Sequence, residues 1–204
     1  MQPLAVTNWN QCYRTGDTPW EKGAPAPPLL SWMAQHGPLT GDVLVPGCGL
    51  GHDVRAIARA SPAARVVGLD VAPLALVQAK KYPQAGSESY ICGDLFRLPA
   101  ELVGAVDWVF EHTCFCAILP EQRLDYVRAV SSALRPTGQF LGIFYLNPWD
   151  PGEAPPEGGP PFGVPTEELD ALFLPEFQLL QEERPKTSYP GREGREILRL
   201  LRKR

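Results

Sequence analysis

The sequence predicts an α/β protein with one doubly wound, mostly parallel sheet. Three observations lead to this class. Short runs of Val, Ile and Leu alternate with segments of helical composition and spacing between residues 42 and 146. The first run leads into a glycine-rich turn. Two more runs near the C-terminus are separated by a Pro-Gly turn, which predicts an antiparallel strand pair. We therefore expect seven strands in one domain, residues 1–204.

The elements follow in order along the chain. Residues 1–38 fit no strand–helix unit, although prolines at 25–28 precede or open a helix ending at His36. After this segment we expect strands at 42–45, 65–70, 89–92, 106–111 and 140–146. The expected helices between them are 52–60, 73–82 and 121–134.

The alternation stops after the fifth strand. Residues 147–165 hold seven of the 23 prolines and four of the 19 glycines, which is typical of a functional loop or a disordered one. Thr166 then has the residue type of a helix N-cap, so we expect a helix to about residue 174. The last strands are expected at 177–183 and 196–202. The basic residues that alternate with Ile and Leu in the second favour a half-exposed terminal strand with charged edges, with a phosphate-binding tail as the alternative.

Charge and cysteine usage narrow the function. The net charge of −4 gives no basic surface for nucleic acid. No apolar run is long enough to span a membrane, and no signal peptide is evident, so we expect a cytoplasmic protein. Five cysteines are an odd number, and Cys114 and Cys116 lack a second pair, so neither a disulfide framework nor a metal site is expected. We expect a small-molecule substrate and a monomer or weak homodimer.

The strongest motif is the glycine loop after the first strand. Gly47, Gly49 and Gly51 follow a buried run and precede a helix, where backbone N–H groups can approach a ligand closely. A dinucleotide-binding loop would need a third glycine at position 52, which is His52. The G-x-G-x-G spacing instead resembles the first motif of class I S-adenosylmethionine-dependent methyltransferases. An NAD(P)-binding oxidoreductase is the alternative.

Acidic residues end three of the expected strands. Asp70 lies about twenty residues beyond the loop, where a carboxylate can accept hydrogen bonds from ribose hydroxyls of either cofactor. In the methyltransferase fold, the turn at Asp94 meets the adenine, with Leu95 and Phe96 covering the ring; the alternative is an ordinary turn aspartate. Glu111 can be a catalytic base, a contact to the cofactor ammonium or a helix cap.

Most of the chain resembles the thiopurine S-methyltransferase family, which includes thiol and halide methyltransferases. The resemblance begins in the front segment, with Trp9, Tyr13, Gly16, Pro19 and Trp20. It continues in four segments of the sheet region, namely Pro46–Gly49, Gly93–Pro99, Glu111–Ile118 and Pro120–Arg123. It ends with Gly159–Pro165, followed by Glu168 and Leu169. Three positions depart from the family pattern, namely Val45, His112 and Tyr13. Thiopurine methylators carry Arg at position 112, whereas residues 113–118 are similar to the thiol and halide branch.

The resemblance implies a Rossmann-like class I methyltransferase domain that uses S-adenosyl-L-methionine and releases S-adenosyl-L-homocysteine. Methyl transfer to a thiol, thiopurine or halide is then an in-line displacement, with Glu111 or His112 as candidate proton acceptors. The cofactor-binding residues expected from it are Trp9, Tyr13, Trp20, Gly47, Gly49, Gly51, Asp70, Asp94, Leu95 and Glu111. Two residues are expected to face the substrate. Trp20 belongs to an N-terminal cap segment (1–38), and Phe162 belongs to the Pro-rich loop (147–165). Alternatively, the aromatic residues belong to the core, or the protein binds the cofactor without catalysis.

Overall fold

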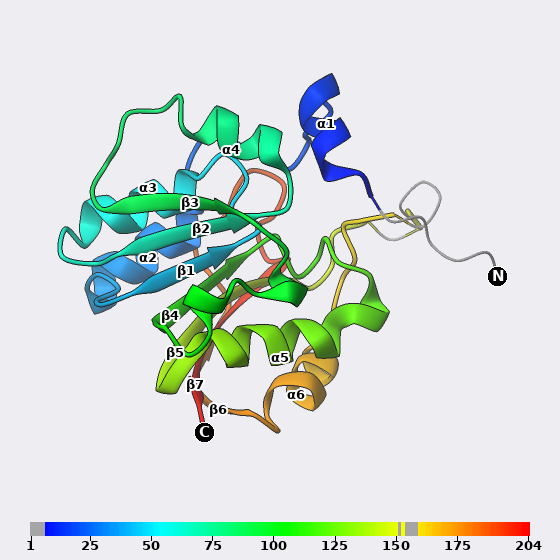
Figure 1. The fold of residues 1–204 in the computed structure, drawn as a ribbon. Helices are drawn as coiled ribbons and strands as arrows, with labels where there is room; N and C mark the ends of the chain where they lie inside the picture. The colour runs from blue at the N-terminus through cyan, green and yellow to red at the C-terminus, as the bar shows by residue number, and fades with distance from the viewer. Residues whose placement is uncertain (1–6, 151, 154–158) are drawn as a thin grey trace.

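The computed structural model describes residues 7–150, 152–153 and 159–204. Its seven strands form one sheet in the order β3-β2-β1-β4-β5-β7-β6 (Figure 1). The first five strands are parallel, and β7 runs antiparallel between β5 and β6. The predicted fold class, with its antiparallel C-terminal pair, is confirmed.

The strands are β1 (Val43–Pro46), β2 (Val66–Asp70), β3 (Glu88–Cys92), β4 (Val106–His112), β5 (Leu134–Tyr145), β6 (Phe177–Glu183) and β7 (Glu196–Lys203). The α-helices are α1 (Trp9–Thr15), α2 (Pro27–His36), α3 (His52–Ala60), α4 (Pro73–Ala79), α5 (Arg123–Ala133) and α6 (Thr166–Phe173). Short 3-10 turns lie at η1 (Leu95–Arg97), η2 (Ala100–Leu102) and η3 (Pro120–Gln122).

Two apolar cores lie on opposite faces of the sheet. Helices α2 and α3 cover one face through side chains such as Trp32 and Ile57. Helices α5 and α6 cover the other, where Tyr126 and Phe173 pack against strand residues such as Phe140. Because the sheet is buried on both sides, its central strands are nearly all apolar, as parallel strands usually are.

The loops after the parallel strands meet at the carboxyl edge of the sheet, which is where α/β proteins of this kind bind ligands. Helix α1 and the described part of residues 147–165 lie at this same end (Figure 1). Helix α1 packs against α4, since Tyr13 contacts Ala72 and Ala75. Segments far apart in sequence therefore converge on the glycine loop.

Three expectations about local structure are wrong. Pro165, not Thr166, is the N-cap of α6. Strand β5 begins at Leu134 rather than at residue 140, because Leu134 pairs with Val106 across an irregularity in the β4–β5 register. Strand β7 is mostly buried rather than half-exposed. It lies inside the sheet, where the buried Arg199 forms ion pairs with Asp170 and Glu182.

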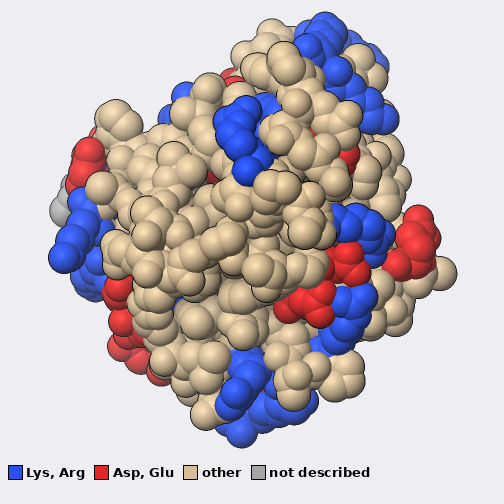
Figure 2. Space-filling model, turned by 90° about the vertical axis from the view of Figure 1, so that its left-hand side faces the viewer, with Lys and Arg blue, Asp and Glu red and all other residues tan. Residues whose placement is uncertain are grey.

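Charges of both signs occur in small separate groups on the face seen in Figure 2. Among the residues that the structure describes, no helix is long and apolar enough to cross a membrane. The absence of a nucleic-acid partner stays a prediction from net charge.

Candidate functional site

The glycine loop joins β1 to α3 with a geometry that requires glycine. Gly47, Gly49 and Gly51 all have positive φ. A Cβ on Gly49 would lie 2.9 Å from the Tyr13 hydroxyl, and one on Gly47 would lie 2.9 Å from the Cys114 Sγ. The front segment and the turn after β4 therefore pack directly against the loop from two sides.

A buried arginine fixes the far end of this loop. Arg55 of α3 donates to the Leu50 carbonyl at 2.8 Å, and its guanidinium lies 4.2 Å from the Tyr82 ring centroid. The predicted site did not include Arg55, because nothing in its neighbourhood in sequence marks it as different from an ordinary helical arginine.

Asp70 ties the end of β2 to the same loop. It is 8% exposed, and its carboxylate accepts hydrogen bonds from the Gly49 and Ala72 N–H groups, each at 2.8 Å. Burial raises the pKa of Asp70 above its usual value. A carboxylate has about four acceptor positions, so two remain for the ribose hydroxyls of a nucleoside.

The predicted front aromatics lie together. The ring centroids of Trp9 and Trp20 are 5.2 Å apart, and Trp20 Nε1 donates to the Tyr13 hydroxyl at 3.1 Å. Trp9 and Tyr13 belong to α1, whereas Trp20 follows it. Asn10 fixes α1 on α4, since its Oδ1 accepts the Leu74 N–H at 3.0 Å. The cluster therefore covers the glycine loop rather than belonging to either main core.

Residues 16–26, which we term the front strap, run from α1 to α2 across the start of α3. Glu21 of the strap lies 2.9 Å from the His52 Nε2. The Ala26 N–H donates to the Asp53 Oδ1 at 2.7 Å. The first two residues of α3 thus hold the strap in place.

Glu111, near the end of β4, is directed toward α5. It is 1% exposed and accepts hydrogen bonds from the Phe115 N–H at 2.8 Å and from the Tyr126 hydroxyl. Burial raises its pKa to about 7. These contacts hold the turn at 113–118. The roles of base and cofactor contact stay predictions.

His112 is directed to the opposite face, because successive strand residues alternate. Its Nδ1 lies 3.4 Å from the Asp53 Oδ2, and its Nε2 lies 3.8 Å from the Glu196 Oε1. Burial alone would lower its pKa, but the hydrogen bonds to these carboxylates raise the pKa to about 9. The ring is therefore charged at neutral pH.

The turn after β3 holds the predicted adenine-binding residues. The Asp94 Oδ1 accepts the Phe96 N–H at 2.9 Å and so caps η1. The Leu95 side chain is largely buried in the core beneath α5, which leaves mainly its backbone open to a ligand. Phe96 is partly exposed. The contacts of Asp94 and Leu95 with the cofactor stay predictions.

The described end of the Pro-rich loop meets the turn after β4. The Phe162 N–H donates to the Cys116 carbonyl at 2.7 Å. Arg123 of α5 donates to the Gly163 carbonyl at 2.9 Å and to Glu168 at 2.8 Å. The predicted substrate residue Phe162 is thus placed beside the site. The predicted substrate-facing loop also includes residues 151 and 154–158, which lie outside the described residues.

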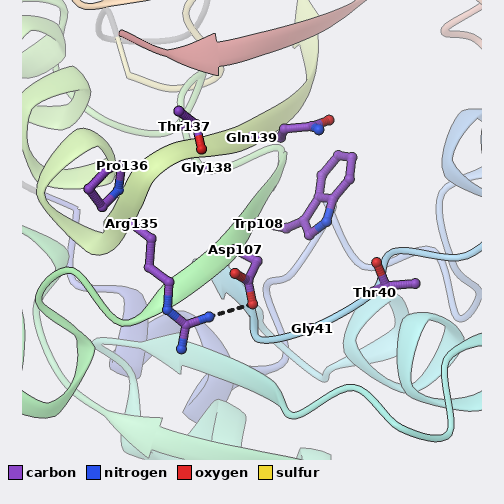
Figure 3. Close-up of a pocket in the computed structure, with 9 residues that line it drawn as sticks. All are labelled: Thr40, Gly41, Asp107, Trp108, Arg135, Pro136, Thr137, Gly138 and Gln139. Atoms are coloured by element: carbon purple, nitrogen blue, oxygen red, sulfur yellow. Dashed lines mark hydrogen bonds and ion pairs between the residues drawn. The ribbon is translucent and has the colours of Figure 1, made fainter.

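A separate hollow lies at the opposite, amino end of the sheet (Figure 3). It has a volume of about 470 Å³ and is lined by Gly41, Asp107, Arg135 and their neighbours. Arg135 forms ion pairs with Asp107 and Asp42, so its charge is already balanced. Across the described part of the chain, no three or more His, Cys, Asp or Glu residues are grouped to hold a metal.

Comparisons with known proteins agree with this geometry. The family model of thiopurine S-methyltransferase matches residues 4–197. Thiocyanate methyltransferase 1 of Arabidopsis thaliana is 33% identical, with 93% of this chain and 82% of that protein covered. Thiopurine S-methyltransferase of Xanthomonas campestris is 30% identical, with coverage of 86% and 84%.

A solved structure shows the same fold. It is 1,6-didemethyltoxoflavin-N1-methyltransferase of Burkholderia thailandensis with bound 1,6-didemethyltoxoflavin and S-adenosylhomocysteine. The TM-score is 0.73 at 19% identity, and the alignment covers 96% of this chain and 85% of that one.

Proposed function

Because this chain belongs to the thiopurine S-methyltransferase family, we propose that its methyl acceptor is a small thiol or a small sulfur-containing anion. The protein is an S-adenosylmethionine-dependent methyltransferase. The observation that carries the proposal is the convergence of the front aromatics and Cys114 on one glycine loop, with Phe162 bound to the same turn as Cys114. These side chains are mostly apolar, which suits a small, polarisable acceptor.

The residues at the carboxyl edge fit the cofactor. Gly49 leaves its backbone open to close approach, and Asp70 beside it has acceptor positions for a ribose. Asp94 and the Leu95 backbone would meet the adenine. Trp9, Tyr13 and Trp20 supply aromatic faces, which attract cations. The cofactor supplies an electrophilic methyl group on a positively charged sulfur.

The chain's own contribution is mainly positional. An in-line displacement needs the nucleophile and the methyl carbon held at near-attack distance, and such positioning can contribute about 7–11 kcal/mol. Glu111 holds the turn at 113–118 through the Phe115 N–H, and Phe162 attaches the Pro-rich loop to that turn at Cys116. The front strap lies across the start of α3, where with the aromatic cluster it would help to exclude water from a bound cofactor.

Two comparisons bear on the choice of acceptor. The Arabidopsis relative is named for thiocyanate, and a second, a probable thiol methyltransferase, is 34% identical over 82% of this chain. Thiopurine methylators carry a basic side chain at position 112 for the substrate, but here His112 is engaged with Asp53 and Glu196. We therefore place thiols and thiocyanate ahead of thiopurines.

The test is turnover of S-adenosylmethionine with a panel of acceptors, measured as S-adenosylhomocysteine formed. We expect turnover with hydrosulfide, benzenethiol and thiocyanate, and slower turnover with iodide and a thiopurine. The Gly49→Ala variant should lose turnover with every acceptor. Gly104→Ala is the matched control, because Gly104 also has positive φ but has nothing within 4 Å of its Cβ position. A preference for the thiopurine would contradict the choice of acceptor. Cofactor binding without turnover would mean a non-catalytic protein.

Two coarser properties remain part of the proposal. The sequence leads us to place the protein in the cytoplasm, as a monomer or weak homodimer. Size-exclusion chromatography with light scattering over a range of concentrations tests the oligomeric state, and a mass of twice 22.4 kDa at all concentrations would contradict it.

A further inference from the structure

A cluster of ionisable side chains is buried behind the site. His112 lies within 3.4 Å of Asp53 and within 3.8 Å of Glu196. Arg192, just before β7, lies 3.3 Å from Glu196 and 3.4 Å from the His112 Nε2. With a charged imidazole the cluster has two positive and two negative groups. A neutral His112 would leave one positive group facing two carboxylates in a largely buried cluster, which is costly.

Two members of this neighbourhood hold the front strap. The Asp53 Oδ1 accepts the Ala26 N–H at 2.7 Å, while its other oxygen faces His112. The Tyr189 hydroxyl donates to the Ala24 carbonyl at 2.5 Å, while its ring lies 5.7 Å from the His112 ring, centroid to centroid. The two side chains that hold residues 24–26 of the strap, Asp53 and Tyr189, therefore both contact the His112 imidazole.

We propose that charged His112 is a positioning residue that locks the front strap over the glycine loop by fixing Asp53 and Tyr189. Asp53 comes from α3, Tyr189 and Arg192 from the segment before β7, and Glu196 from β7 itself. These groups face His112 from α3, from β7 and from the segment before β7. The strap contains Trp20 and follows α1 directly, so its position sets the position of the aromatic cluster. The lock rests on the proposed role of that cluster in cofactor binding.

The lock has a defined pH dependence. The pKa of His112 is raised to about 9, so the stabilisation that its charge contributes is fully present below the usual pKa of 6.5 and is lost as pH rises through about 9. The strap should therefore loosen over this range. Neither His36, which is exposed on α2, nor the ion pairs of Arg135 at the opposite end of the sheet share these contacts.

The test is hydrogen exchange of the Ala26 N–H by NMR. The reference is the Asp42 N–H, which donates to the Asp107 carboxylate at 2.8 Å, far from the cluster. In His112→Gln we expect the exchange rate of the Ala26 N–H, divided by that of the Asp42 N–H, to rise at least about tenfold. A tenfold rise corresponds to the free energy of a pKa shift of about one unit. His112→Arg, which keeps the charge, should retain protection, and the control His36→Gln should match the wild type. In the wild type, Ala26 should lose protection relative to Asp42 as pH rises through 9.

Kinetics and cofactor binding complete the test. We expect His112→Gln to raise KM for S-adenosylmethionine by about tenfold or more with a smaller change in kcat, and His112→Arg to reverse this. Equal protection of Ala26 in wild type and His112→Gln, or equal loss at Ala26 and Asp42, would overturn the lock. Selective loosening in a protein that binds no S-adenosylhomocysteine would support the lock and overturn the cofactor role of the cluster.

Discussion

Adjacent residues at the end of β4 have different chemistry because the strand directs them to opposite faces. Glu111 meets the Tyr126 hydroxyl on α5, whereas His112 meets Asp53 on α3. Sequence alone predicted both as proton acceptors, since both follow an apolar strand at the carboxyl edge. The structure separates them: one is a buried carboxylate that holds a turn, and the other is a buried cation that balances two carboxylates.

The Glu111→Gln variant should change how stability depends on pH. The pKa of Glu111 is raised from 4.5 to about 7, so folding takes up a proton between these values and stability falls as pH rises through 7. Glutamine can still accept from the Phe115 N–H. We expect the stability of the variant relative to wild type to rise by about 2–3 kcal/mol between pH 4.5 and 8, measured by urea unfolding.

The exposed Glu121→Gln is the control and should show no such trend. Methyl transfer to thiols should be retained in Glu111→Gln, because the carboxylate is occupied by the turn and by Tyr126. A loss of kcat greater than about 100-fold in a variant with wild-type stability would instead support a general base at this position.

Residue-level prediction succeeded where the determinant is local. Gly47, Gly49 and Gly51 could be identified because strand, glycine loop and helix follow each other directly. The partners of His112 could not, because Asp53 and Glu196 lie 59 and 84 positions away and look like ordinary surface acids. The burial of the Leu95 side chain beneath α5 could not be predicted either, because it depends on the packing of a helix that lies further along the chain.

At the scale of elements, strong start and stop signals gave correct boundaries. Helix α3 spans residues 52–60 as predicted, between Gly51 and the Ser61–Pro62 stop. Strand β5 was predicted to begin six residues too late, because Pro136 and Gly138 are typical of a turn. Pairing with β4 overrides that local preference. The position of β7 between β5 and β6 depends on long-range pairing, which single-strand composition does not encode.

Arg123 connects α5 with the Pro-rich loop and so controls one wall of the site. Its guanidinium donates to the Gly163 carbonyl and to Glu168 at once, a fork that lysine cannot reproduce. We expect Arg123→Lys to raise KM for the acceptor by about 3–10-fold, with cofactor affinity nearly unchanged, since one charge-assisted hydrogen bond contributes about 1.5–3 kcal/mol and part of it is kept. Steady-state kinetics measures KM for the acceptor, and calorimetry with S-adenosylhomocysteine measures the cofactor affinity.

Arg128→Lys is the matched control, because Arg128 lies on the same helix but is exposed, and among the described residues its ion pair is with Asp125. It should leave both quantities unchanged. If Arg123→Lys instead weakened the cofactor and left the acceptor KM unchanged, the placement of the Pro-rich loop on the acceptor side of the site would be wrong.

At the scale of the whole molecule, segments distant in sequence form one ligand edge. The front strap is attached both to α3 and to Tyr189 near the C-terminus. Many of the 23 prolines lie in the two segments that border this edge, where a restricted backbone lowers the entropy lost on ordering. Because distant segments share one edge, a cofactor bound there should stabilise the whole domain rather than one loop.

S-Adenosylhomocysteine should therefore raise the melting temperature of the whole protein in a single transition. At 100 times its Kd, a ligand that binds only the folded state stabilises it by about 2.7 kcal/mol, or about 5–10 °C for a domain of this size. NAD should cause no rise, because the loop has His52 where a dinucleotide-binding loop has its third glycine. Gly49→Ala should lose most of the shift, since its Cβ would meet the Tyr13 hydroxyl, while Gly104→Ala should keep it despite the same backbone strain. Scanning calorimetry measures all four cases, and an equal rise with NAD, or a full shift in Gly49→Ala, would show that the ligand is not bound at this loop.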